Sequence, residues 1–78
     1  MKAWLYRVVV NFGPSTTHNT LESALRAWDA QIFNTRVYSG VIEYREWDEN
    51  GDCVRDCNVI HLLSSGSIYV LPTIGGLP

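Results

Sequence analysis

The chain is poor in cysteine, in long apolar runs and in positive charge, and each shortage excludes a class of protein. Two cysteines among 78 residues are too few for a disulfide-rich secreted scaffold, so we expect free thiols in the reducing cytoplasm. Residues 5–10 form a short apolar segment that is interrupted by Arg7 and lacks a cleavage pattern, so we expect no signal peptide. No apolar run approaches the ~18 residues of a membrane-spanning helix.

Charge is unevenly distributed along the chain. Six Lys and Arg side chains against eight Asp and Glu give a net charge of −2, which argues against electrostatic binding to nucleic acid or to an anionic membrane. Four of the six cations precede residue 40, whereas six of the eight carboxylates follow it. Residues 46–52 hold four carboxylates and no cation, so we expect a local acidic surface there.

The strongest local signal is Asn50-Gly51, which lies between two alternating segments and predicts a β-hairpin over residues 42–59. A two-residue loop at Asn50-Gly51 determines which residues face each other across the hairpin. The predicted pairs are Glu46–Arg55, Arg45–Asp56, Tyr44–Cys57, Ile42–Val59 and Trp47–Val54. A three-residue loop with a bulge would set Arg45 against Arg55, so the two-residue loop is the predicted one.

Hydrophobic periodicity predicts four strands and one helix. The strands span residues 3–12, 36–48, 52–63 and 67–71, and the helix spans residues 20–33 with a capping box at Asn19 and Glu22. The predicted fold class is α+β, a two-layer sandwich with one helix packed on a small, mostly antiparallel four-stranded sheet in the order β-α-β-β-β. The sequence does not determine where the first strand joins the sheet, and direct pairing with the second would require a parallel, right-handed crossover.

One domain is expected. Residues 1–72 form that single α+β domain, and residues 73–78 are predicted to be a flexible C-terminal tail because they are rich in glycine and proline. A chain of this length buries only about 60–65% of its unfolded surface, which leaves little room for a second core.

Two patterns within residues 48–61 suggest a metal site. Cys53, Cys57 and His61 are spaced four apart, which would bring them together on a helix, but on a strand they spread over roughly 26 Å. Residues 48–52 are similar to the start of a calcium-binding EF-hand loop, but Cys53 stands where that loop needs glycine and Val59 where it needs glutamate. We therefore predict neither a metal nor any other cofactor.

No segment carries the pattern of a catalytic site. The serines and cysteines lie in no nucleophile elbow, and residues 13–15 and 75–76 match no phosphate-binding loop. Carboxylates on a hairpin are typical of solvated ion pairs, and a chain this small has little room for a substrate pocket of roughly 300 Å³. We predict that the protein is not an enzyme.

Protein binding is the remaining function. The predicted register leaves one face of the hairpin with mixed apolar and charged side chains, as in an interface core with a polar rim. We expect this face and the acidic tip to bind a larger protein with a basic surface. The candidate partner-binding residues are Glu43, Glu46, Trp47, Asp48, Glu49, Asp52, Val54 and Asp56.

Three alternatives stay open. Lys2, Arg7, Arg26 and Arg36 could bind nucleic acid directly, an exposed sheet edge or face could join copies into a homodimer or larger oligomer, and the mixed face could be ordinary solvated surface. In size, element order and acidity the chain resembles phage and mobile-element accessory proteins, including anti-CRISPR proteins. The resemblance implies an inhibitor that occupies a basic groove of a nucleic-acid-handling protein, and no motif accompanies it.

Overall fold

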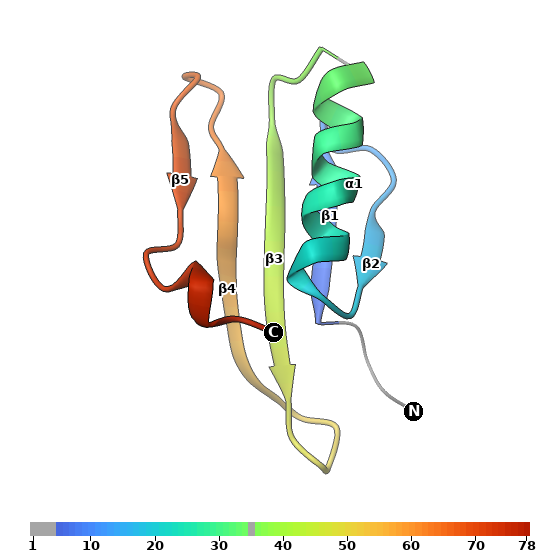
Figure 1. Ribbon diagram of the computed structural model, residues 1–78, viewed down its shortest axis with the longest axis vertical. Coiled ribbons are helices and arrows are strands. Elements are labelled where there is room, and N and C mark those ends of the chain that lie inside the picture. The colour runs from blue at the N-terminus through green and yellow to red at the C-terminus, as the bar shows by residue number, and fades with distance from the viewer. Residues whose placement is uncertain (1–4, 35) are drawn as a thin grey trace.

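The computed structural model describes residues 5–34 and 36–78, which form one layer of helix on one layer of sheet (Figure 1). The strands are β1 (Tyr6–Val10), β2 (Thr16–His18), β3 (Gly40–Trp47), β4 (Cys53–Leu62) and β5 (Ile68–Val70). The α-helix is α1 (Leu21–Asn34), and a short 3₁₀ helix, η1 (Ile74–Gly76), follows β5. Within the described ranges, no helix has the length and apolar character needed to cross a membrane.

The α+β class, the helix on one face and the antiparallel sheet are confirmed, and the predicted element order is roughly but not exactly right, because the described sheet has one strand more than the four predicted. The described residues form five strands, in the order β-β-α-β-β-β, because β2 was not predicted. Its three residues, Thr16-Thr17-His18, are all polar and show no alternation. This segment is a strand because it pairs with β1, and no local sequence pattern predicts that pairing.

The extra strand also changes the direction of pairing. The spatial order is β2-β1-β3-β4-β5, and every neighbouring pair is antiparallel. Because β2 reverses the chain before α1, β3 enters the sheet antiparallel to β1, with Val8 opposite Ile42. The parallel crossover considered for direct pairing is therefore wrong.

One face of the sheet packs on α1 and forms the core. Its buried members are Tyr6, Val8, Val10, Ala24, Trp28, Ile42, Tyr44, Val59 and Ile60. Alternate residues of β1 and β3 supply most of them, as the period of two in a strand requires. Trp28 lies against Gly40, where a Cβ atom would come within 2.7 Å of Cη2 of the indole ring. Glycine at this position therefore lets the indole ring approach the backbone of β3.

Helix α1 is capped differently from the prediction. The hydroxyl oxygen of Thr20, not Asn19, accepts a hydrogen bond from the Ser23 backbone N–H at 3.2 Å. The main-chain oxygen of Pro78 accepts two more, from the Leu21 N–H at 2.9 Å and from the Tyr6 hydroxyl at 2.7 Å. The first turn of the helix is thus joined to residues far away in the sequence.

Residues 73–78 lie on the core and contain η1. Ile74 and Leu77 pack against the buried cluster, and Pro78 holds the hydrogen bonds just described. Flexibility of this segment stays a prediction. In Figure 1 the segment runs from the end of β5 across β4 and ends in front of β3.

The pairing of β3 with β4 agrees with the prediction at its centre. Three predicted pairs are confirmed: Tyr44–Cys57, Arg45–Asp56 and Glu46–Arg55. A bulge interrupts the ladder on each side of these pairs, and each bulge adds one residue to β4.

The bulge nearer the loop corrects the predicted turn. Gly51 has a φ of 85°, whereas Asn50 is not among the described residues with positive φ, so this is not a two-residue turn with two left-handed residues. Asp48 accepts from the Gly51 N–H at 3.1 Å and donates its own N–H to Asp52 at 2.9 Å, which closes a three-residue loop. Trp47 then lies opposite Cys53, so the predicted Trp47–Val54 pair is wrong.

The three-residue loop shifts the strand register by one residue. Val54 has no opposite residue on β3, so this bulge restores the predicted register from Glu46–Arg55 onward. The far bulge at Val59 sets Ile42 opposite Ile60, so the predicted Ile42–Val59 pair is also wrong. Val59 and Ile60 are consecutive and both are buried, a pattern that a regular strand with one covered face does not give.

Candidate partner-binding site

The far end of the β3–β4 hairpin projects beyond α1 and β1 (Figure 1). We call residues 46–55 the hairpin end. Trp47 and Asp48 are partly buried there, and all other residues of the hairpin end are exposed. This is the segment in which the sequence concentrates carboxylates, so the predicted acidic tip does lie on a protruding surface.

Asp48 builds the loop. Its carboxylate oxygen Oδ1 accepts hydrogen bonds from the backbone N–H groups of Asn50 and Asp52, each at 2.9 Å. An aspartate that bonds to the backbone two residues on is a common turn-forming device. Asp48 therefore has a structural role at this site and is less available to a partner than its neighbours.

Three other carboxylates of the hairpin end form no ion pair within the described residues. They are Glu46, Glu49 and Asp52, and all three are exposed. Since exposed carboxylates without a counter-charge keep their full attraction for an approaching cation, these three carry the acidic character of the surface.

Arg55 lies across from Glu46 but contacts the Tyr44 ring instead. Its guanidinium carbon is 5.6 Å from the ring centroid, a cation–π distance. Burial raises the pKa of the Tyr44 phenol above its usual value; the Glu46 carboxylate adds to this shift and the Arg55 guanidinium opposes it. The base of the hairpin end is thus electrostatically connected to the core.

Trp47 and Val54 supply apolar surface beside the carboxylates. Trp47 lies at the last position of β3, and Val54 is the bulged residue of β4 and is 60% exposed. An aromatic and a branched apolar side chain next to charge match the composition of interface cores and rims. The structure therefore places Glu46, Trp47, Glu49, Asp52 and Val54 of the predicted set on the hairpin end, with the consecutive strand residues Glu46 and Trp47 on opposite faces of the ribbon.

Glu43 and Asp56 belong to a separate ladder of charges on the sheet face that α1 does not cover. Arg7 donates to Glu43 Oε1 at 2.6 Å, Arg45 lies 3.9 Å from Glu43 Oε2, and Arg45 Nε lies 3.4 Å from Asp56. This ladder joins β1, β3 and β4. Partly exposed pairs of this kind contribute about 0–1 kcal/mol each, so their role is mainly to hold register and charge balance.

The residues considered for metal binding stay apart. Cys53, Cys57 and His61 all lie on β4, and both cysteines are free. Across residues 5–34 and 36–78, no three His, Cys, Asp or Glu side chains are grouped in a way that could hold a metal ion.

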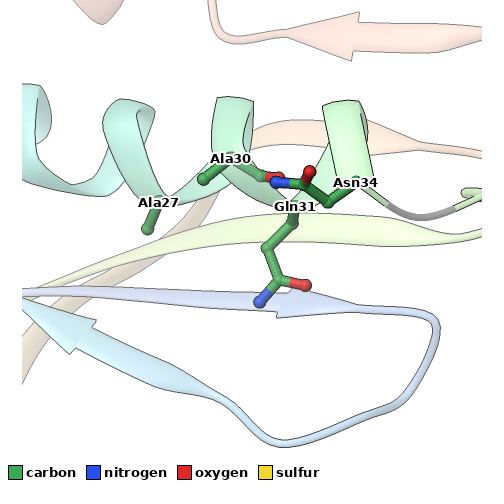
Figure 2. A pocket seen from close by; sticks show the side chains of 4 residues that line it. All are labelled: Ala27, Ala30, Gln31 and Asn34. Atoms are coloured by element: carbon green, nitrogen blue, oxygen red, sulfur yellow. The ribbon is translucent and has the colours of Figure 1, made fainter.

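A shallow depression of about 380 Å³ lies along one side of α1. Figure 2 shows its lining residues, Ala27, Ala30, Gln31 and Asn34, all of which come from the helix. None of these side chains titrates near neutral pH or acts as a nucleophile, so this depression offers no chemistry.

Two of the cations considered for nucleic-acid binding, Arg7 and Arg26, lie on opposite sides of the sheet in the described structure. Arg7 pairs with Glu43 on the uncovered sheet face, whereas Arg26 pairs with Glu22 on α1 at 2.6 Å, on the other side of the sheet. Arg36 lies in the segment before β3, and Lys2 lies outside the described residues.

Comparison with known proteins gives no match to a family model, to a curated protein or to a solved structure. Only the chemistry and shape of its own surface can then support a function for this chain. On that surface, the hairpin end is where charge, apolar contact and protrusion coincide.

Proposed function

We propose that this chain is a non-enzymatic protein-binding module whose hairpin end docks on a basic surface of a larger protein. The observation that carries the proposal is the set of three exposed carboxylates, Glu46, Glu49 and Asp52, without an ion-pair partner in the described chain. They lie on a ribbon that projects past the helix (Figure 1).

Such a contact would speed the encounter with a basic partner and would discriminate against acidic proteins. Carboxylates steer a basic surface toward the ribbon at low salt and repel an acidic one, while adding little stability to the monomer. Trp47 and Val54 then supply the apolar contact that a charged rim alone lacks. A narrow two-stranded ribbon can enter a groove that a flat sheet face cannot.

We further propose that the partner is a nucleic-acid-handling protein and that this chain inhibits it. Grooves that bind phosphates are lined with Lys and Arg, and a ribbon that carries carboxylates is their electrostatic complement. The resemblance in size and acidity to phage and mobile-element accessory proteins, including anti-CRISPR proteins, supports the same partner class. A reducing cytoplasm, expected from the free thiols, stays a prediction.

A matched pair of charge reversals tests the proposal. The tip variant carries Glu49→Lys and Asp52→Lys; the helix variant carries Glu22→Lys and Asp29→Lys, and both change the net charge by the same amount. Each protein is immobilised and used to capture partners from nuclease-treated lysate of the native host, and the bound proteins are identified by mass spectrometry.

We expect wild type and helix variant to retain the same basic protein and the tip variant to lose it. Equal capture by all three proteins would remove the hairpin end from the mechanism. Capture that is seen only from lysate without nuclease treatment would favour the nucleic-acid alternative instead.

A further inference from the structure

The two edges of the sheet differ in chemistry. At the β2 edge, Thr16 and His18 bond to each other at 2.9 Å, and the other ring nitrogen of His18 bonds to Ser23 of α1 at 2.7 Å. This edge is polar and its side chains are engaged. At the β5 edge, Ile68, Tyr69 and Val70 are 59%, 44% and 46% exposed.

The backbone of β5 also has unused hydrogen-bonding capacity. The Leu63 N–H donates to Ser67 and the Leu71 N–H donates to Val59, at 2.9 and 2.8 Å, and these two bonds frame the strand. Hydrogen bonds alternate along an antiparallel strand, so Tyr69 bonds toward β4 while the N–H and C=O groups of Ile68 and Val70 face outward. β5 is last in the strand order, so a further strand could bind there.

The usual protection of an edge strand is sparse at β5. Natural edges carry lysine, proline, inward charges or a covering helix, in addition to being short. β5 is short, but it has no charged residue and no proline, and α1 lies over the other half of the sheet (Figure 1). The sequence has no Asp, Glu, Lys or Arg at all from residue 57 to residue 78.

We propose that β5 pairs antiparallel with β5 of a second copy of this chain, which joins the two sheets into one of ten strands. Centred on Tyr69, this pairing sets Ile68 of one copy opposite Val70 of the other and uses all the outward backbone groups of these residues. The two Tyr69 side chains then meet across the twofold axis on the uncovered sheet face, where aromatic cross-strand pairs are stabilising.

Self-complementarity of β5 favours a second copy over a different partner strand. An uncharged strand meets an identical strand without like charges in opposition, and a closed twofold contact does not propagate into fibres. The twofold axis runs perpendicular to the sheet, so the two hairpin ends point in opposite directions and their carboxylates stay far apart. Ile68 and Val70 share the helix-facing side of their partners Leu62 and Ile60, so the dimer also merges two exposed apolar patches.

Sedimentation equilibrium under reducing conditions, over about 5 to 500 μM, tests the pairing. Wild type should pass from monomer to dimer in this range, and Tyr69→Lys should weaken the association at least about tenfold because two lysines meet on the axis. Thr17→Lys is the matched control, since it places the same charge on the other edge strand. It should dissociate like wild type.

A mixture of Tyr69→Lys and Tyr69→Glu supplies the second measurement. The opposite charges should restore a dimer that neither variant forms alone, which a misfolded variant could not do. Wild type that stays monomeric at 500 μM, or a dimer equally weakened by Thr17→Lys, would overturn the proposal. The hairpin end takes no part in this contact, so the tip variant should dimerise normally whether or not it binds a partner.

Discussion

The part of the sheet beneath α1 and the part that carries the hairpin end are made from the same long strand, β3, yet they differ in what their residues do. Beneath the helix, every second residue of β1 and β3 is buried, and Trp28 packs on Gly40. Beyond the helix, residues 53–56 of β4 are all exposed, and Glu46, Glu49 and Asp52 take part in no ion pair of the described structure. The comparison teaches that the buried contacts that stabilise the fold are concentrated beneath the helix. The residues of the hairpin end can therefore vary with little effect on folding.

Two tryptophans give the largest test of this comparison. Trp28→Ala should lower the free energy of unfolding by about 3–5 kcal/mol, because a buried aromatic is replaced by a cavity. Trp47→Ala, in the hairpin end, should cost less than half as much. Urea denaturation followed by circular dichroism measures both, and Trp28→Phe provides a folded intermediate if the alanine variant is unfolded. Equal losses would break the contrast.

Alkaline pH should have the next largest effect on the free energy of unfolding. Burial is the main cause that raises the pKa of the Tyr6 phenol to about 12, with smaller contributions from Tyr44 and Cys57. The unfolded chain releases this proton from pH 10 upward while the folded chain holds it, so stability is complete below pH 10 and falls as the pH rises toward 12. The loss should reach at most about 2–3 kcal/mol.

Tyr6→Phe should remove part of that pH dependence when the free energy of unfolding is measured by urea titration at pH 9 to 11.5. Tyr38→Phe is the matched control because Tyr38 is exposed. If the two variants show the same slope as wild type, Tyr6 is not the group that titrates.

The two tight turns should respond in opposite directions to glycine and alanine. Phe12 is held at a φ of 57° and is 82% exposed, so Phe12→Gly should raise the free energy of unfolding by about 1 kcal/mol by relieving left-handed strain. Gly51→Ala should lower it by about 1 kcal/mol, since Gly51 has a φ of 85° with no atom near its Cβ position. Thermal unfolding measures both, and a loss of stability in Phe12→Gly would show that the Phe12 ring has a packing role.

The smallest effect on stability belongs to the hairpin end. The tip variant should unfold within about 0.5 kcal/mol of wild type, because the reversed side chains are exposed and take part in no ion pair of the described structure. A larger loss, measured by the same urea titration, would mean that the carboxylates contribute to folding.

Local patterns predicted much of the fold but not its long-range contacts. The apolar spacing of α1 and the alternation around Tyr44 marked a helix and a hairpin, and the pairs at the centre of that hairpin were confirmed. β2 was missed because three polar residues become a strand only by pairing with β1. The bulges at Val54 and Val59 were missed because alternation records parity and not the insertion of one residue.

The candidate site was predicted in part for the same reason. Glu49 and Asp52 lie at an exposed loop as charge clustering predicted, whereas Asp48 turned out to hold the loop together. Glu43 was assigned to partner binding because nothing local shows that Arg7 lies beside it; that contact needs the β1–β3 pairing, which the sequence left open. The sequence analysis considered an exposed sheet edge but could not assign it to β5, because a short apolar strand does not show whether it ends at the edge of a sheet.

One measurement tests most directly the claim that the hairpin end binds while the helix-covered part folds. The partner identified by capture is titrated with wild type, tip variant and helix variant, and the dissociation constants are compared at two salt concentrations. The account predicts that the tip variant binds at least about tenfold more weakly and with a smaller salt dependence, while the helix variant matches wild type. Equal affinity of the tip variant and wild type would contradict it.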